Sequence, residues 1–318
     1  KSLQDGNVKD ETVKEQGILS GIVPLLPIQK WFFENRFTVS HHWNQSFVIK
    51  TPELDLEVLS KSIKVLVEHH DALRLRYTKK QTQYYDDKVI IEKINVLDVN
   101  TIATDKELSS VFTSWQSNFN IQRGPLYSIG YIRGFKDGSA RIFFAFHHLI
   151  IDTVSWRILT EDLRELYYKI VKEDGPLSLG EKGSSYRQWV SKVDDYKTTC
   201  KDEKNYWDNV VLDIEKSNKI LKSLATSLNT FSEFVLGSDL IDKLLLESLR
   251  AYNSEINDVL LTALSLSLNE SIGTRVNHIT MEGHGREEVI GNGLDISRTV
   301  GWFTTMYPVR LEVRSDGA

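Results

Sequence analysis

One ten-residue stretch, HHLIIDTVSW at His147–Trp156, constrains the fold more than any other part of the chain. The six residues before it, RIFFAF, form a short apolar block that predicts a buried strand. After it, apolar residues recur at helical spacing from Leu159 to Ile170, and Asp152 stands where a helix N-cap accepts hydrogen bonds from the first free amides. We therefore predict a strand that passes directly into a helix. Such a junction holds side chains rigidly at an edge, which suits a catalytic base.

Composition limits the classes of protein that this chain can belong to. Its 318 residues fit two domains of about 100–200 residues, and its apolar content of 41% is ordinary for a globular protein. A net charge of −5 gives no electrostatic basis for binding nucleic acid or an anionic membrane. Cys200 is the only cysteine, so no internal disulfide can form and a reducing, cytoplasmic setting is expected.

No targeting or membrane segment is visible in the sequence. The polar first residues, KSLQDGNVKDETVKEQ, lack the apolar core of a signal peptide, and no stretch reaches the 18 or so apolar residues of a spanning helix. The chain does not begin with methionine, so we expect it to be part of a longer polypeptide.

Alternating predicted strands and helices favour an α/β sandwich in two lobes. Residues 1–17 are charged and poor in apolar side chains, which predicts a linker. A run rich in glycine and serine begins near residue 175 and predicts a break between lobes. We therefore expect an N-terminal lobe at 18–176, an inter-lobe linker at 177–197 and a C-terminal lobe at 198–318.

Six of the eight histidines form pairs, at 41–42, 69–70 and 147–148. The 69–70 pair follows a predicted helix, where imidazolium charge is favourable, so a structural role is preferred. The 41–42 pair is also interpreted as structural, in a loop or at a strand start. For 147–148 the residues leave two interpretations open, a satisfied core histidine or a base. Ser155 follows Asp152 too closely for a catalytic triad and is interpreted as a packed hydroxyl at the helix start.

Two later segments could complete a site. In MEGHGREE (Met281–Glu288), glycines at 283 and 285 permit tight or left-handed backbone beside Glu282, although a solvated glycine turn is the simpler interpretation. The segment RTVGWFTTMYP (Arg298–Pro308) predicts a packed wall beside a channel, or a core strand. Other chemistries lack their motifs: there is no phosphate-binding P-loop, no complete dinucleotide fingerprint, no zinc motif and no G-x-S-x-G.

Together these segments resemble the epimerization domain of nonribosomal peptide synthetases, a branch of the condensation-domain superfamily. Five segments in the family's order, from residue 26 to 308, carry the resemblance: LPIQKWFFE, HHLIIDTVSWRIL, NDVLLTAL, EGHGREE and RTVGWFTTMYP. The double histidine indicates the superfamily, whereas EGHGRE together with RTVGWFTxxYP marks the epimerizing branch. Thr153 departs from the glycine usual after the aspartate. The resemblance implies two lobes like chloramphenicol acetyltransferase with an active-site tunnel between them, and a C-terminal lobe truncated at residue 318.

The resemblance also implies a reaction and its residues. The family inverts the Cα centre of an aminoacyl or peptidyl thioester from L to D, in the biosynthesis of antibiotic-type peptides. His148 and Glu282 match its acid–base pair, with the order of proton transfer left open. Asp152 matches a structural aspartate, and we hypothesise that it pairs with Arg298 or Arg286. Further side chains are expected to support the site, with the last two lining the pocket or bonding an enolate: His147, Ser155, Trp156, Arg298, Trp302 and Tyr307.

The implied partners follow from that reaction. No metal and no directly bound cofactor are expected, because the substrate arrives on the 4′-phosphopantetheine of a carrier domain. We expect that domain before Lys1 in the same polypeptide, beside further synthetase modules, with no nucleic acid or membrane partner. Two alternatives remain: a condensation-type transferase that forms peptide bonds, and a non-catalytic module that docks a carrier domain.

Overall fold

The computed structural model describes residues 13–173, 175–224, 232–248, 250, 253–287 and 289–314. The chain divides into two compact units. The first unit comprises Lys1–Thr199 and Gly283–Thr305, and the second comprises Cys200–Glu282 and Met306–Ala318. The chain therefore leaves the first unit after Thr199, returns to it for 23 residues directly after Glu282, and leaves it again after Thr305. The lobe and linker boundaries expected from the sequence stay predictions.

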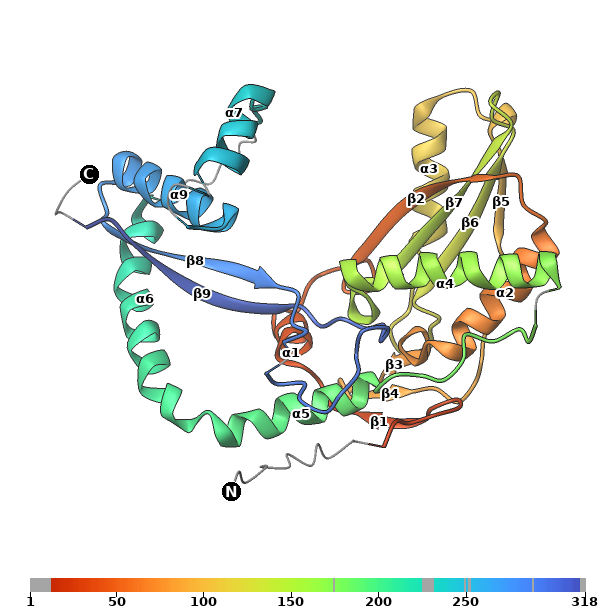
Figure 1. The fold of residues 1–318 in the computed structure, drawn as a ribbon, viewed down its shortest axis with the longest axis horizontal. Helices are drawn as coiled ribbons and strands as arrows, with labels where there is room; N and C mark the ends of the chain where they lie inside the picture. Colours follow the sequence, from red (N-terminus) through yellow and green to blue (C-terminus); the bar gives the residue numbers. More distant parts are fainter. Residues whose placement is uncertain are drawn as a thin grey trace, which may run out of the picture. The chain divides into compact units, whose positions relative to one another are not determined.

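A four-stranded sheet forms the centre of the first unit (Figure 1). Its order is β2 (Asn44–Pro52), β7 (Ser139–His147), β6 (Tyr127–Arg133) and β5 (Asn95–Asp98). The β2–β7 and β7–β6 pairs are antiparallel, and the β6–β5 pair is parallel. Strand β7 is buried along almost its whole length, so the buried strand predicted from RIFFAF is confirmed.

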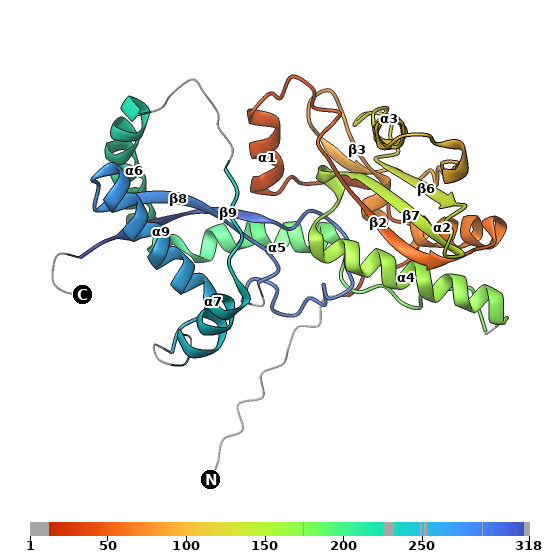
Figure 2. The same ribbon diagram turned by 90° about the horizontal axis from the view of Figure 1, so that it is seen from above.

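Helices cover both faces of this sheet, because successive side chains of β7 point to opposite sides. Phe143 stacks on Phe112 of α3 (Asp105–Gln116), whereas Phe144 stacks on Phe47, which in turn packs on Trp156 of α4 (Thr153–Lys172). Figure 2 shows α3 on one side of the strands, and α4 with α2 (Leu56–His69) on the other.

Local signals explain where α2 and α4 begin. Asp55 caps α2 by accepting from the amides of Glu57 and Val58, and Asp152 caps α4 by accepting from the amide of Ser155. An aspartate at this position satisfies amides that lack a partner inside the helix. Each helix then buries an apolar stripe against the sheet, so the helix predicted after Asp152 is confirmed.

A smaller sheet of the first unit has the order β1 (Gly21–Val23), β4 (Gln83–Tyr85) and β3 (Leu75–Tyr77), all antiparallel. Helix α1 (Pro27–Glu34) follows β1, and its N-terminal turn carries a proline, whose fixed φ suits that position. Helix α5 (Tyr186–Thr199) lies within the first unit and occupies most of the predicted inter-lobe linker.

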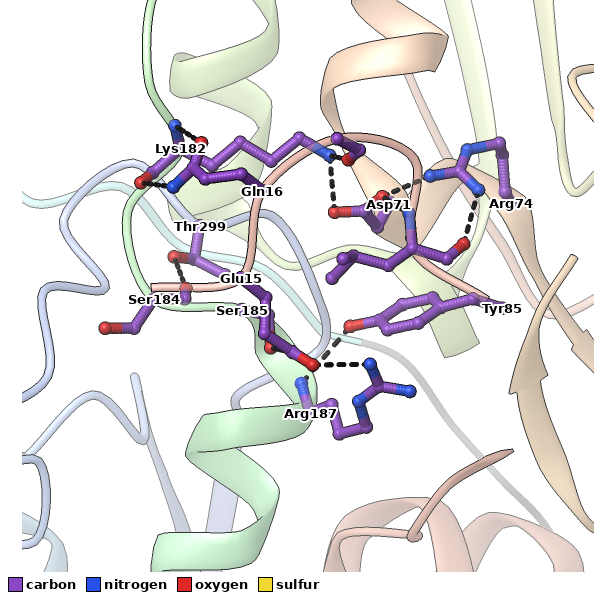
Figure 3. A network of polar contacts seen from close by, with 12 residues as sticks. Glu15, Gln16, Asp71, Arg74, Tyr85, Lys182, Ser184, Ser185, Arg187 and Thr299 are labelled. Atoms are coloured by element: carbon purple, nitrogen blue, oxygen red, sulfur yellow. Dashed lines mark hydrogen bonds and ion pairs between the residues drawn. The ribbon is translucent and has the colours of Figure 1, made fainter. Parts of the chain in front are cut away.

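Residues 13–17, which we call the N-terminal strap, are tied to the first unit by polar contacts (Figure 3). Glu15 forms an ion pair of 2.5 Å with Arg187, and the side-chain amide of Gln16 bonds both the backbone N–H and the carbonyl of Lys182 at 2.9 Å. The Lys182 ammonium in turn bonds Asp71 at 2.8 Å. Residues 1–12 of the predicted linker lie outside the described residues.

The second unit contains a two-stranded sheet of β8 (Val276–Gly283) and β9 (Thr305–Glu312). Its helices are α6 (Lys204–Leu224), α7 (Ser238–Asp242), the π-helical η5 (Lys243–Ser248) and α9 (Ile256–Ile272). Of the helices within the described ranges, none has both the length and the hydropathy needed to cross a bilayer.

Candidate functional site

The paired histidines lie at the junction predicted from the sequence. Strand β7 ends at His147, and a single 3-10 turn, η3 (His148–Ile150), leads to the Asp152 cap of α4. The two imidazoles therefore occupy adjacent positions whose backbone is fixed by a strand on one side and a capped helix on the other. Their environments nevertheless differ.

His147 is fully buried and has a structural environment. Its Nδ1 accepts from the amide of Leu149, so the proton lies on Nε2, which donates to the carbonyl of Ser40 at 2.8 Å. Burial lowers the pKa of His147 to about 4. A neutral imidazole that is hydrogen-bonded at both nitrogens helps to orient His148 and has no nitrogen left to contact a substrate.

His148 has the arrangement of a base. Its Nδ1 lies 3.0 Å from the carbonyl oxygen of Ile151, which can only accept, so Nδ1 carries the proton and Nε2 keeps its lone pair. The side-chain amide of Gln45, on β2, lies 2.7 Å from that Nε2. The ring of Trp302 lies 4.4 Å from the imidazole, centroid to centroid, and His148 is half-buried.

A buried polar cluster supports this turn from behind. The hydroxyl of Tyr77 and the amide of Gln29, on α1, lie 2.9 and 3.3 Å from the carbonyl oxygen of Leu149, the residue after His148. Gln83 joins both side chains at 2.6 Å. All three polar side chains are buried, and burial raises the pKa of Tyr77, so its hydroxyl keeps its proton. The LPIQKWFFE segment thus contributes Gln29 to the support of the histidine turn.

Asp152 is paired with Arg286. The Arg286 guanidinium lies 3.2 Å from the Asp152 carboxylate, which also accepts from the backbone amide of Phe303 at 3.2 Å and caps α4. The same guanidinium donates to the carbonyls of Ile296 and Thr299 and lies 3.7 Å above the Phe303 ring. Burial lowers the pKa of Arg286, and Asp152 acts in the opposite direction.

Of the two candidate partners of Asp152, Arg298 is therefore the wrong one. Arg298 bonds Glu161 at 2.6 Å and also Asp162, both on α4 and more than two turns beyond the cap. Asp162 in turn bonds His70, at the end of α2. Burial acts to raise the pKa of Asp162, but the hydrogen bond to His70 and the charge of Arg298 leave it lowered. The sequence could not separate the two arginines, because both follow Glu282 closely.

Ser155 is the packed hydroxyl that the sequence indicated. It is buried, donates to the carbonyl of Gly301 at 3.0 Å and lies 3.1 Å from the Gly301 amide. Trp156 packs its ring on Phe47 at 4.8 Å. Thr153, in the place of the usual glycine, is exposed. Ser155 therefore joins α4 to the segment Gly301–Phe303, and Trp156 joins the same helix to the sheet.

The EGHGREE segment turns sharply at Gly285. This glycine has a φ of +69°, and a Cβ added there would lie 1.6 Å from the carbonyl oxygen of Phe303. Only glycine fits such a left-handed, closely packed position. The turn brings Arg286 to Asp152, so the left-handed backbone predicted for this segment is confirmed at Gly285.

Two of the remaining predicted site residues, Glu282 and Tyr307, lie in the second unit. Glu282 is an exposed residue of β8, directly before the chain returns to the first unit at Gly283. Tyr307 lies on β9 and is 39% exposed. Trp302, by contrast, belongs to the first unit and is buried beside His148. The predicted pairing of His148 with Glu282 stays a prediction.

Gln45 is the residue of this site that sequence reasoning missed. It is separated from His148 by 103 positions, so no local sequence pattern connects the two residues. Among the described residues, no group of three or more His, Cys, Asp or Glu side chains is placed to hold a metal ion.

Known proteins give this arrangement a family. The family model described as "Condensation domain" matches residues 19–317. The chain is 42% identical, over 94% of its length, to N-(5-amino-5-carboxypentanoyl)-L-cysteinyl-D-valine synthase of Amycolatopsis lactamdurans, and covers 8% of that protein. It is 36% identical, over 95% of its length, to Gramicidin S synthase 1 of Brevibacillus brevis, and covers 28% of it. The chain therefore spans a small part of these curated relatives.

Solved structures agree with the family match. The epimerization domain from the third module of tyrocidine synthetase B superposes with a TM-score of 0.75 at 32% identity, covering 94% of this chain and 68% of that one. The first condensation domain of the calcium-dependent antibiotic synthetase superposes at 0.68 over 92% of this chain and 70% of that one, with 16% identity, which shows the fold alone. The chain thus belongs to the condensation-domain family of nonribosomal peptide synthetases and has its chloramphenicol-acetyltransferase-like α/β fold.

Proposed function

We propose that this chain is an epimerization domain that inverts the Cα centre, from L to D, of an aminoacyl or peptidyl thioester. The observation that carries the proposal is the position of His148, whose Nδ1 contacts the Ile151 carbonyl, so that the neutral ring has its lone pair on Nε2, and whose turn is supported by a buried cluster. The co-occurrence of EGHGREE and RTVGWFTTMYP supports the epimerizing branch, as does the 32% identical relative described as an epimerization domain.

The reaction needs a base on one face of Cα and an acid on the other. A thioester eases removal of the α-proton, because the electron pair of the C–H bond can move to the carbonyl oxygen as an enolate. A neutral histidine is suited to take that proton near neutral pH. We assign His148 as one acid–base group and Glu282 as its opposite, with no preference for which acts first. When the opposite group returns a proton to Cα, the centre is inverted.

The pair of Asp152 and Arg286 has a structural role in this scheme. It holds the residues that directly follow Glu282 onto the cap of α4, the helix that begins five residues after His148. We infer that the pair, with Ser155 and Trp302, positions the backbone around the acid–base residues and takes no part in proton transfer. Tyr307 is assigned to the pocket.

The substrate is proposed to arrive on the phosphopantetheine arm of a carrier domain, in the same polypeptide and N-terminal to Lys1. The curated relatives are several times longer than this chain, which is consistent with neighbouring domains and modules. The protein itself supplies only side chains, and no cofactor of its own enters the scheme.

The proposal is tested by solvent exchange at Cα. The carrier-bearing polypeptide is loaded with an L-aminoacyl group in D₂O, the thioester is cleaved, and the product is analysed by mass and on a chiral column. We expect one deuterium at Cα and a mixture of L and D products. Both His148→Ala and Glu282→Gln should abolish net inversion, whereas Glu287→Gln, an exposed glutamate of the same segment, should leave it intact.

Three results would reject the assignment. Full inversion by a protein that carries both His148→Ala and Glu282→Gln would show that neither group is needed. Formation of a dipeptide with an aminoacyl carrier as acceptor, without exchange at Cα, would favour the alternative of a condensation transferase, which the family match and the fold also accommodate. Carrier binding with neither product would favour a docking module.

A further inference from the structure

Gln45 occupies a distinctive position on β2. The strand pairs Gln45 with Phe146 of β7, and its side chain shares a face with Phe47, which packs on Trp156 of α4. The Gln45 carboxamide therefore lies near the end of β7, where His148 begins the turn that follows the strand. The amide nitrogen then lies 2.7 Å from the Nε2 of that histidine.

The direction of this hydrogen bond follows from the other side of the ring. Because Ile151 offers a carbonyl oxygen to Nδ1, the neutral imidazole keeps its lone pair on Nε2, and Gln45 must donate to it. The Oε1 of Gln45 is buried and has no hydrogen-bond partner within the described residues. The polar contact that orients the carboxamide is thus the one to the proposed base.

Nε2 of His148 cannot accept a proton from a substrate while it accepts the hydrogen bond from Gln45. The nitrogen has one lone pair, in the plane of the ring, and a proton leaving Cα must approach along it. The thioester oxygen lies about 2.4 Å from Cα, from bond lengths of about 1.5 and 1.2 Å and a trigonal angle. When the incoming Cα–H displaces the Gln45 N–H from Nε2, this N–H therefore has to move only a short distance to reach the carbonyl oxygen.

We propose that Gln45 is a catalytic residue. In the resting protein its side-chain N–H donates a hydrogen bond to Nε2 of His148, and when the thioester binds the same N–H donates to the carbonyl oxygen instead. This inference rests on the proposed epimerization. As the C–H bond breaks, the proton goes to Nε2 and the electron pair moves to that oxygen, where Gln45 stabilises the enolate. Return of a proton to the opposite face restores the carbonyl, and Gln45 caps the base again once product leaves.

The surroundings of His148 make such a donor effective. Trp302 covers one side of the imidazole, and His147, next in sequence, stays neutral because burial lowers its pKa to about 4. His41 and His42 are the other titratable groups that act on His147, and both lie before β2. A fixed N–H at a partly buried site is worth far more to a developing oxyanion than it is in water, and removing one such donor costs about 10²–10³-fold in rate.

The test uses Gln45→Glu, which keeps the shape of the side chain but replaces the N–H with an acceptor. Gln81→Glu, in an exposed turn, adds the same charge elsewhere and is the matched control. The first measurement is the titration of the His148 ring by ¹⁵N NMR in the carrier-bearing protein without substrate. The second is the rate of deuterium incorporation at Cα from pH 6 to 9.

We expect Gln45→Glu to raise the pKa of His148, because a carboxylate bonds the imidazolium, and to lower the exchange rate at least about 10²-fold. The rate should stay low even above the raised pKa, since no N–H is present to stabilise the enolate. Recovery of the exchange rate at high pH would overturn the proposal, because Gln45 would then affect only the pKa of His148. An unchanged titration of His148 would overturn the contact itself. A wild-type protein that shows no exchange would instead reject epimerization, independently of the NMR result.

Discussion

Replacing Asp152 with alanine should destabilise the first unit by about 3–4 kcal/mol. The carboxylate is 4% exposed and serves three partners: the Arg286 guanidinium, the amide of Phe303 and the first turn of α4. Removing one member of a buried ion pair costs about 3–5 kcal/mol, and loss of an N-cap costs about 1 kcal/mol. These costs overlap, and Arg286 keeps two carbonyl partners, so the lower part of the range is expected.

The assay is thermal and denaturant unfolding of five proteins: wild type, Asp152→Ala, Asp152→Asn, Arg286→Met and the double variant of the last two. For a unit of about 200 residues, each kcal/mol lowers the Tm by about 2–4 °C, so Asp152→Ala should lower it by about 6–16 °C. Asparagine retains the helix cap and should cost less than alanine. The double variant should recover part of the loss, because it leaves no uncompensated charge.

Two outcomes would refute this reasoning. If Asp152→Ala lowered the free energy of unfolding by less than about 1 kcal/mol, the carboxylate would not be the buried anchor described above. If the losses of Asp152→Asn and Arg286→Met simply added in the double variant, the two side chains would not interact, whatever their separation of 3.2 Å.

Two further predictions concern the same unit. Gly285→Ala should lower the Tm much more than Gly138→Ala does. Both glycines have a positive φ, but of the two only at Gly285 would the new Cβ meet backbone, namely the carbonyl oxygen of Phe303. Equal losses would contradict the close packing at Gly285. Since His147 has a folded pKa of about 4 against about 6.5 unfolded, its contribution is complete above pH 6.5. As the pH falls from about 6.5 to about 4, about 3 kcal/mol should be lost. His147→Asn should flatten the fall in stability across that window, and an unchanged slope would show that another group titrates.

The histidine junction could be predicted because its signals are local. An apolar run, a capping aspartate and a helical stripe follow one another within about 25 residues, and each acts on backbone close to itself. The short strands β1 and β4 could not be predicted in the same way. Three residues carry no periodicity, and the two strands pair across 60 to 64 positions of the sequence.

The strap shows a different limit of sequence reasoning. Apart from Val13 and Gly17 its residues are polar, and polarity without apolar periodicity predicts a linker. Yet Glu15 and Gln16 are bound to Arg187 and Lys182, about 170 positions away, through ion pairs and amide contacts that leave no pattern in either segment. Composition reports how much apolar surface a segment can bury and does not report which polar partners tertiary structure supplies.

The polar contacts of the site divide into two sets by their distance from the proposed chemistry. One set, Gln29 and Tyr77, reaches the backbone carbonyl beside His148, and its members are buried and bonded to one another. Gln45 is different, because it is half-buried and its oxygen is left without a partner within the described residues. A buried polar atom without a hydrogen bond is costly to the folded state and needs an explanation. That cost is reasonable where a side chain must change partners during a reaction, and Gln45 is the side chain that contacts the base.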